Sequence, residues 1–536
     1  MGIVIRMTKV IKTKVIKTQV VKTGAFKTSL VLLLSFGLLS ACAVNPVTGK
    51  QELSLVSEQQ EISIGKKNYL PAQQSQGGEY TIDKELTEYV NGVGQQLVKV
   101  SDRPNLPYEF VVLNNGVPNA WALPGGKIAL NRGLLLELNN EAELAAVMSH
   151  EVVHAAARHG AKSLERGILF QVGLIGVGAA AADEDNSRFI VGAASVSAAL
   201  ISKKYGRNAE LESDRYGMEY MVRVGYNPEA AVTLQETFVR LSEGKEGNWL
   251  EGLFASHPPS QERVAANRQR AQELGAKGKL GAEEYQAKIA HLKKTKPAYD
   301  AYEQGQKALK EKKPDEALEL AAKAIEIEPR EALFYSLQGE AWKAKGDKRK
   351  AEESFSRAVE HNSQHFLPYL QRGLMRAELA QDIEAEQDLR ASTELLATAP
   401  AYLGLGDLAQ KAGKEEMAIG FYRQASDSKT ATGQQALAKL ARLDLPQNPG
   451  DYLKVQAGLS QRGTMILRIN NQAGVDVKNV RLHAAFSNTA GKTALEKSLH
   501  IENIIATGQS LAVDTGLTPP PGTNLRLQIL AAEIAN

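Results

Sequence analysis

A period of 34 residues runs through region 297–430 and restricts the fold more than any other feature of this 536-residue chain. Small residues mark the period, at Gly305, Gly339, Gly373, Ala317, Ala351 and Ala385, and Ala418 follows 33 residues after the last of these. Small side chains at such positions allow paired helices to approach closely, and neighbouring pairs then stack into a solenoid with a concave surface. We therefore predict an all-α repeat region, with a non-repetitive helical bundle as the alternative.

The period resembles that of tetratricopeptide repeats, which implies four helix pairs. They are expected at Pro297–Arg330, Glu331–Gln364, His365–Thr398 and Ala399–Thr430. The prolines and glycine of Leu445–Tyr452 indicate a linker, after which alternating apolar runs and the turn "PPPG" predict strands. Residues 445–536 are therefore expected to form a small β-sandwich, to which no chemistry is assigned.

The first 41 residues resemble a bacterial lipoprotein signal peptide. They contain seven basic residues and no acid, and they end in the apolar run Ser29–Ala41, which is too short to cross a bilayer. Cys42 is the only cysteine of the chain, and Leu39–Cys42 has the form of a lipobox, which implies lipidation of Cys42. Alanine after this cysteine implies sorting to the outer membrane. An uncleaved anchor or a chance cysteine is the alternative.

The pattern of residues 42–292 is that of a mixed α and β domain with long helices. Capping signals predict helices that begin after Ser57 and Asn140, and a further helix is expected from Asp83 to about Val98. Gly160 is expected to end the third helix. Strands are expected in "YEFVVLN" from Tyr108 and "KIALN" from Lys127, with a turn at "LPGG" between them.

Two apolar segments lie within residues 168–202, and each is shorter than a membrane span. We interpret them as a helical hairpin over the core of the domain. A membrane-touching or substrate-facing role for this hairpin stays open.

The chemistry of the chain centres on "SHEVVH", which holds His150, Glu151 and His154. Two histidines four residues apart lie on one face of a helix, one turn from each other, so both imidazoles can ligate one zinc ion. Glu151 is then placed to hold a water whose pKa the zinc lowers towards 7, and to remove its proton during attack on a peptide carbonyl. Short motifs of this kind also occur by chance in long chains.

A third protein ligand is required, and "NAELESDRYG" offers Glu210 with Asp214 on the same helical face. Glu210 would complete a set of two histidines and a glutamate, and Asp214 would orient a ligand histidine. The alternative is that both acids lie on a solvated helix face. His159 is five residues after His154, about 140° round a continuous helix, so we interpret it as a packing or hydrogen-bonding residue.

Five elements in this order resemble the HtpX and CAAX prenyl protease family of zinc metallopeptidases, in its periplasmic branch. They are HExxH at His150, ExxxD at Glu210, a His-Pro pair at His257 followed by Arg263, and the stretches "NPVTGKQELSLVSEQQE" and "NAWALPGGKIALNRGLL". The resemblance covers roughly residues 45–270 and implies an α+β, zincin-like fold. The chain departs from membrane-spanning members of the family because it has no convincing span.

The resemblance implies one zinc ion per chain with His150, His154 and Glu210 as ligands, Glu151 as general base and Asp214 as support for a ligand. His257 is expected to stabilise the oxyanion of the reaction or to occupy the open position of zinc, with a histidine placed at the start of a helix as the alternative. The segment Trp121–Leu130 is expected to form an edge strand beside the cleft, to which an extended substrate adds as a further strand.

The sequence thus predicts a zinc endopeptidase tethered to the outer membrane and facing the periplasm. Its expected substrates are unfolded or misassembled envelope proteins. The repeats would dock these client proteins or the outer-membrane assembly machinery. Without the basic N-terminus the chain carries a small net negative charge, which does not favour nucleic acid as a partner. The alternative function is that of a chaperone or assembly scaffold whose peptidase site is normally silent.

Overall fold

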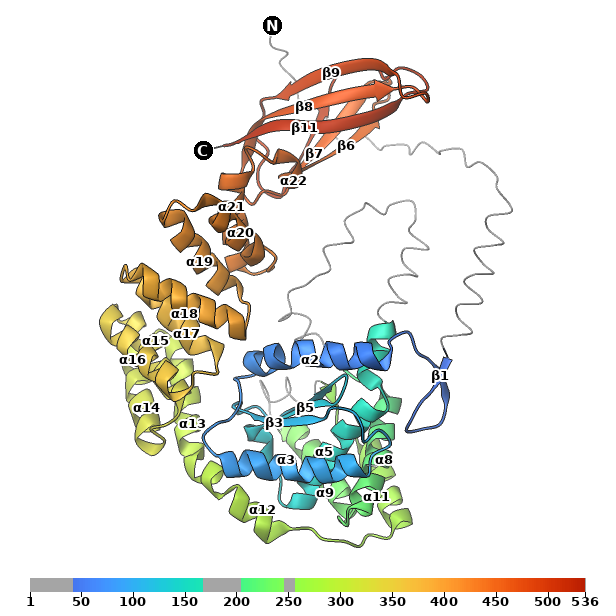
Figure 1. Ribbon diagram of the computed structural model, residues 1–536, viewed down its shortest axis with the longest axis vertical. Coiled ribbons are helices and arrows are strands. Elements are labelled where there is room, and N and C mark those ends of the chain that lie inside the picture. The colour runs from blue at the N-terminus through green and yellow to red at the C-terminus, as the bar shows by residue number, and fades with distance from the viewer. Residues whose placement is uncertain (1–41, 167–203, 245–255, 536) are drawn as a thin grey trace. The chain divides into compact units, whose positions relative to one another are not determined.

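The computed structural model describes residues 42–166, 204–244 and 256–535 (Figure 1). The expected signal peptide and the expected apolar hairpin at 168–202 lie outside these residues. The chain divides into two compact units, one that ends at Thr398 and one that begins at Ala399. Among the described residues, no helix is long and apolar enough to cross a membrane.

A three-stranded mixed sheet lies in the first unit, with strand order β3-β5-β4. β3 (Glu109–Leu113) runs parallel to β5 (Lys127–Asn131), and β4 (Ala120–Leu123) runs antiparallel to β5. The prediction of one edge strand over Trp121–Leu130 is therefore wrong: of the two strands in this segment, β4 is at an edge of the sheet and β5 is central. The reason is the turn between them, where Gly125 and Gly126 take φ values of 77° and 84° that favour glycine.

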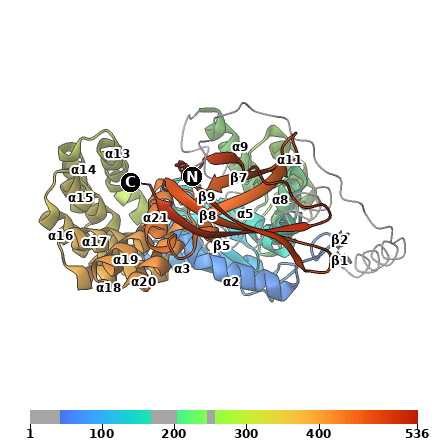
Figure 2. The same ribbon diagram turned by 90° about the horizontal axis from the view of Figure 1, so that it is seen from above.

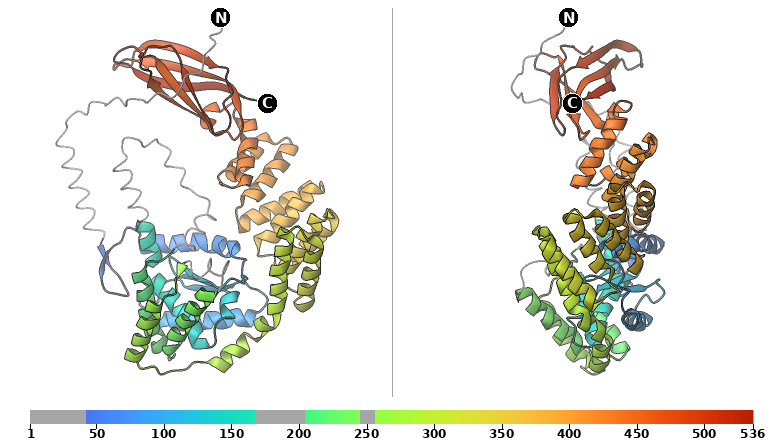
Figure 3. Two further views of the ribbon diagram at one scale, coloured as in Figure 1. Left: turned by 180° about the vertical axis from the view of Figure 1, so that it is seen from behind. Right: turned by 90° about the vertical axis from the view of Figure 1, so that its left-hand side faces the viewer.

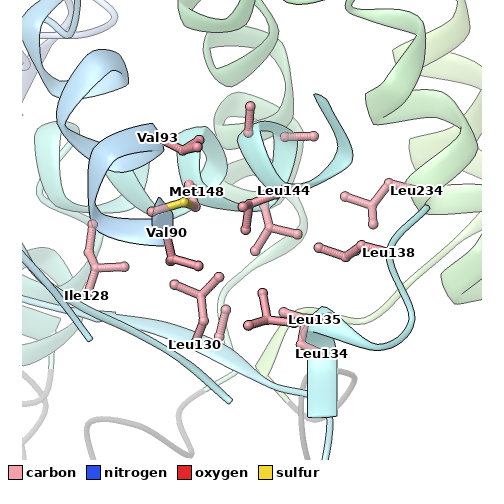
Figure 4. Packing of buried hydrophobic residues seen from close by; sticks show 14 of the residues in the cluster. Val90, Val93, Ile128, Leu130, Leu134, Leu135, Leu138, Leu144, Met148 and Leu234 are labelled. Carbon is pink, nitrogen blue, oxygen red and sulfur yellow. The ribbon is translucent and has the colours of Figure 1, made fainter. Parts of the chain in front are cut away.

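Helices cover this sheet and build the core of the unit. The two predicted caps are present: Ser57 forms a capping box for α2 (Glu58–Ser75), and Asn140 caps α5 (Glu141–Ala156). The expected helix from Asp83 is α3 (Lys84–Lys99), which Asp83 caps. α3 buries apolar residues at helical spacing, which places them against α5 and β5. Figure 4 shows this contact, with Val90 and Val93 beside Leu144 and Met148, and Ile128 and Leu130 below them.

Three more helices complete the region of the site. They are α8 (Arg207–Arg223), α9 (Glu229–Gly244) and α11 (Gln261–Leu274), and α8 packs on α5. An N-terminal hairpin of β1 (Cys42–Val44) and β2 (Gln51–Leu53), which the sequence did not predict, precedes α2.

The repeat region of the first unit consists of helix pairs, as predicted (Figure 2). After α12 (Ala282–Lys288) the pairs are α13 (Ala290–Lys310) with α14 (Pro314–Ile327), α15 (Ala332–Ala344) with α16 (Lys348–His361), and α17 (Phe366–Glu378) with α18 (Asp382–Leu395). The first helix begins at Ala290, so that Pro297 lies inside it. A Cβ on Gly339 would lie 2.4 Å from the ring of Phe355, which explains why the period needs glycine at this position.

The second unit combines helices with two sheets (Figure 3). Its helices are α19 (Ala399–Lys411), α20 (Glu415–Ser426), α21 (Ala431–Asp444) and α22 (Pro449–Tyr452). One sheet has the order β10-β7-β6 and the other β11-β8-β9, formed by β6 (Leu453–Leu459), β7 (Met465–Asn471), β8 (Val477–Ser487), β9 (Thr493–Ile501), β10 (Ser510–Asp514) and β11 (Asn524–Ile534). Apolar residues of both sheets, such as Leu467 and Phe486, share one buried cluster, which confirms the predicted strand-rich region.

Candidate metal centre

α5 places two histidines on one face, as its period requires. His150 and His154 are one turn apart, and their Nε2 atoms are 3.0 Å from each other. Every residue of α5 is buried, so both imidazoles are withdrawn from solvent.

α8 brings two carboxylates to these histidines. Glu210 Oε2 lies 3.5 Å from His150 Nε2, and Glu210 Oε1 lies 3.5 Å from His154 Nε2. Asp214 Oδ1 lies 2.8 Å from His150 Nδ1, the nitrogen on the other side of that ring. The close approach of α8 depends on Gly217, since a Cβ there would lie 3.0 Å from Ser149 Oγ and 3.2 Å from the His150 amide nitrogen. The alternative of a solvated face does not hold, because Glu210 is 2% exposed.

His257 joins this cluster from the segment before α11. Its Nδ1 lies 3.1 Å from Glu210 Oε1 and 3.3 Å from His150 Nε2, and its Nε2 lies 3.5 Å from Glu151 Oε1. Ser260 caps α11, so His257 precedes the cap and its ring turns into the cluster instead of starting the helix. One donor atom each from His150, His154, Glu210 and His257 lies within 4.8 Å of all the others.

Arg263 forms ion pairs with both carboxylates, a contact that the sequence motif did not reveal. The buried guanidinium donates to both oxygens of Asp214 at 2.7 Å, and its Nη1 lies 2.9 Å from Glu210 Oε2. Burial alone would raise the pKa of Asp214, but Arg263 and His150 lower it from 3.8 to about 2. Burial opposes ionisation of Glu210 as well, and the adjacent imidazoles of His257, His150 and His154 hold its pKa well below the usual value.

Glu151 lies beside the cluster in an environment that favours its neutral form. Burial raises the pKa of its carboxyl above the usual value, while His257 and His150 oppose that rise. Its Oε2 is buried and makes no hydrogen bond within the described parts of the chain. A carboxylate with a raised pKa and a free oxygen is suited to accept a proton from a bound reactant.

α5 ends earlier than the sequence predicts. It stops at Ala156, and Arg158 takes a left-handed conformation with a φ of 62°. The chain turns there, and residues 159–166 form a further helix that contains Gly160. The prediction that Gly160 ends the helix is therefore wrong.

Contacts with the N-terminal segment explain the turn at Arg158. Its side chain donates to Glu61 Oε2 at 3.1 Å, to Ser54 Oγ at 2.5 Å and to the carbonyl oxygen of Val56. Glu61 is fully buried and also binds Arg103, whose Nη1 lies 3.3 Å from the carbonyl oxygen of Ala155 at the end of α5. Such surroundings hold a non-glycine residue at positive φ.

The turn places His159 beside His154. Their Nδ1 atoms are 2.9 Å apart, so a hydrogen bond between the rings fixes the orientation of His154, while His159 Nε2 lies 3.2 Å from Glu212 Oε1. His159 is a hydrogen-bonding residue, as predicted. The angle of about 140° between His154 and His159 holds for a continuous helix, and it does not apply here because the helix is interrupted between the two residues.

Tyr205 is a residue of the site that sequence reasoning missed. Its ring centroid lies 4.0 Å from that of His154 and 5.4 Å from that of His257. Its backbone N–H donates to the carbonyl of Ser256 at 3.2 Å, which joins the start of α8 to the segment that carries His257. A single tyrosine before a helix gives no sequence signal of this position.

These residues fit a divalent metal ion. Imidazole nitrogens with one carboxylate oxygen form the donor set of catalytic metal sites. His257 Nε2 and Glu151 Oε2 are buried and have no hydrogen-bond partner in the described ranges, a condition that is rare for polar atoms unless they face a ligand.

Comparison with known proteins agrees with this geometry. Residues 84–271 match the sequence profile described as Peptidase family M48. A relative from Escherichia coli strain K12, the Beta-barrel assembly-enhancing protease, is 29% identical over 238 residues, which are 43% of this chain and 47% of the relative. The Mitochondrial metalloendopeptidase OMA1 of Schizosaccharomyces pombe is 33% identical over 181 residues, which are 33% of this chain and 51% of that protein.

The chain spans about half the length of these curated relatives. Among solved structures, the TPR domain of Arabidopsis OM64 has 23% sequence identity and a TM-score of 0.22, and the likeness covers 22% of this chain and 98% of that one. The profile match includes His150, Glu210 and Arg263 and confirms the resemblance inferred from the motifs. Residues 84–271 are therefore similar to the metallopeptidases of Peptidase family M48.

Proposed function

We propose that this protein is a zinc-dependent endopeptidase that hydrolyses peptide bonds of unfolded or misassembled envelope proteins. The observation that carries the proposal is the buried cluster of His150, His154, Glu210 and His257 with Glu151 beside it. Two histidines and one glutamate as metal ligands, with an adjacent base, form one of the known sets of a catalytic zinc site.

The roles follow from the positions of the side chains. His150, His154 and Glu210 would hold one zinc ion, which supplies Lewis-acid activation of water and of the scissile carbonyl. Glu151 accepts a proton from the attacking water and then delivers it to the amine nitrogen as the C–N bond breaks. Asp214, bound to His150 Nδ1, keeps that ring oriented with Nε2 towards the cluster.

The position of His257 supports one of the two expected roles. Because its Nδ1 lies within the cluster, His257 would occupy the open position of the metal in this conformation. In that position it keeps the site closed, and it has to move before a substrate carbonyl can bind.

The setting of this activity is inferred from the N-terminus and the relatives. The lipobox at Cys42, followed by alanine, supports a lipid anchor in the outer membrane with the protein facing the periplasm, and the name of the Escherichia coli relative supports a role in β-barrel assembly. The helix pairs supply a surface on which clients or assembly machinery would dock. An extended client would add to β4, the edge strand of the sheet, through main-chain hydrogen bonds.

Cleavage of an unfolded protein by the wild type and by Glu151→Gln, with zinc measured on both, tests the proposal. We expect cleavage by the wild type alone and equal zinc in both proteins, since Glu151 is the base and not a ligand. Glu143→Gln is the matched control, because Glu143 is equally buried on α5 but binds Asn139 and Thr233 instead of the cluster. Absence of zinc from all three proteins would contradict the metal site.

A second function is favoured by the closed position of His257. With this residue in the cluster at rest, the protein would act mainly as a chaperone or assembly scaffold whose peptidase is silent. Expression of Glu151→Gln in cells that lack the protein separates the two functions. Full cellular activity of the variant would favour the scaffold, and loss of that activity favours the peptidase.

A further inference from the structure

We infer that the first repeats are part of the catalytic body, and that Glu331 is a positioning residue which fixes the edge strand β4 beside α5. This inference rests on the proposed peptidase function for its kinetic test, but the contacts that carry it do not depend on the metal. They join the loop between β3 and β4, residues 114–119, to the helices α13 and α15.

Glu331 is the centre of these contacts. It caps α15, is 2% exposed, and accepts a hydrogen bond from the Leu333 amide on Oε1 at 3.1 Å. Its Oε2 accepts from the hydroxyl of Tyr299 at 2.7 Å and from Nδ2 of Asn114 at 3.0 Å. A buried carboxylate with three donors holds them firmly, since hydrogen bonds to a charged group are stronger than neutral ones. Two of the donors belong to the repeats, and the third belongs to the loop.

Arg132 closes the same contact from the side of the sheet. Its Nε donates to Asn114 Oδ1 at 2.9 Å, and its guanidinium carbon lies 3.4 Å from the centroid of the Tyr299 ring. The loop also approaches α13 closely, because a Cβ on Gly116 would lie 2.5 Å from Glu303 Oε1. The loop is therefore held between the sheet and the first repeat.

The rest of the loop passes this restraint to β4. Asn131 Nδ2 donates to the carbonyl of Val117 at 2.8 Å, and the Asn131 amide donates to the carbonyl of Asn119 at 2.8 Å. β4 begins at the next residue, Ala120, and packs on α5, the helix that carries His150. A change in the position of Glu331 thus reaches the edge strand through a short segment whose carbonyls at Val117 and Asn119 are hydrogen-bonded to Asn131.

A second contact, at Gln74, prevents the repeats from rotating about the contact at Glu331. The side chain of Gln74, at the end of α2, donates to the carbonyl of Gln364 and accepts from the amide of Phe366, both at 2.8 Å. A Cβ on Gly78 would lie 3.0 Å from the ring of His365, which is buried at the same place. The repeats thus contact the catalytic domain at two separate places, at Glu331 and at Gln74. Removal of the first three repeats would expose both the loop and α2.

The test compares Glu331→Gln with the wild type on a short fluorogenic peptide and by hydrogen exchange. Gln has one acceptor oxygen and two added donor hydrogens, so the variant leaves one of the three donors unpaired at nearly unchanged volume. We expect kcat/KM to fall about 10-fold at unchanged metal content, which is less than the roughly 100-fold loss that a full displacement of about 1 Å at a substrate-binding element can cause. The amides of residues 114–123 should exchange faster.

Glu328→Gln is the matched control. Glu328 is 3% exposed and binds Arg330 and His291, and all three residues lie in the repeat region. This variant should keep kcat/KM and the exchange of β4. Tyr299→Phe removes one donor only and provides a milder variant should Glu331→Gln fail to fold.

Equal effects of Glu331→Gln and Glu328→Gln on kcat/KM and on exchange would overturn the inference and make the contact one of stability alone. Faster exchange confined to residues 114–123, with reduced kcat/KM, supports it. If the wild type cleaves no peptide, the proposed function fails, and the exchange of β4 alone then decides the inference.

Discussion

Replacement of Asp214 by Asn tests how much the site depends on its buried ion pair. A carboxyl whose pKa falls from 3.8 to about 2 on folding stabilises the folded protein by about 2 kcal/mol at neutral pH. Asn cannot accept both hydrogen bonds of Arg263, and removal of one partner of a buried pair costs about 3 to 5 kcal/mol. We therefore expect Asp214→Asn to lower the free energy of unfolding of the metal-free protein by about 2 to 5 kcal/mol.

The pH dependence follows from the direction of the pKa shift. Because the folded pKa of Asp214 is depressed, its contribution is complete above the unfolded pKa of 3.8 and is lost as the pH falls through about 2. The part of the stability difference between wild type and variant that comes from the Asp214 carboxylate should thus shrink below pH 3.8. Urea unfolding of chelator-treated protein over this range measures it.

Metal affinity separates a role at the centre from general stability. Asp214 orients His150 through Nδ1, so its loss should weaken metal binding by about 10- to 100-fold, as measured by competition with a chromophoric chelator. Asp388→Asn is the matched control, because Asp388 is 4% exposed and binds Arg372 and Arg376 through both oxygens in the repeats. It should lose stability and keep metal affinity. Equal metal affinity in both variants would refute the orienting role of Asp214.

Two further substitutions test local packing and the turn after α5. Gly339→Ala places a methyl group 2.4 Å from the ring of Phe355 and should destabilise the repeats by about 1 to 3 kcal/mol. Gly420 lies on a helix with nothing within 4 Å of the added Cβ, so Gly420→Ala should stabilise the protein by up to about 1 kcal/mol. Chemical denaturation measures both changes, and equal effects would contradict the packing argument. His159→Phe keeps the ring volume but removes the hydrogen bond to His154 Nδ1, so metal affinity should fall about 10-fold by equilibrium dialysis, and unchanged affinity would show that the bond does not orient the ligand.

Much of the fold was predictable because its signals are local. The caps at Ser57 and Asn140 involve residues within three positions of each other, and the structure confirms them. The 34-residue period predicted the helix pairs because each glycine of the period lies close to another repeat helix, either in its own pair or in the neighbouring pair. The spacing of His150 and His154, and of Glu210 and Asp214, placed each pair on one helical face.

The errors of prediction occur where distant residues decide the backbone. The end of α5 depends on Arg158, which Glu61 and Ser54 hold at positive φ from about 100 residues earlier in the chain. No feature of "HAAARHG" reveals those partners, and glycine was the only local signal for a helix end. The local turn at Gly125 and Gly126 divides Trp121–Leu130 into two strands, but β5 is central only because it also pairs with β3.

The sequence by itself determined the candidate residues of the site and the helical spacing that presents them. The tertiary structure decided how these residues meet: Arg263 neutralises the two carboxylates of α8, His257 turns into the cluster, and Glu331 ties the repeats to the loop before β4. The physical reason is that periodicity and capping act over a few residues, whereas burial of charge requires partners that only the folded chain brings together.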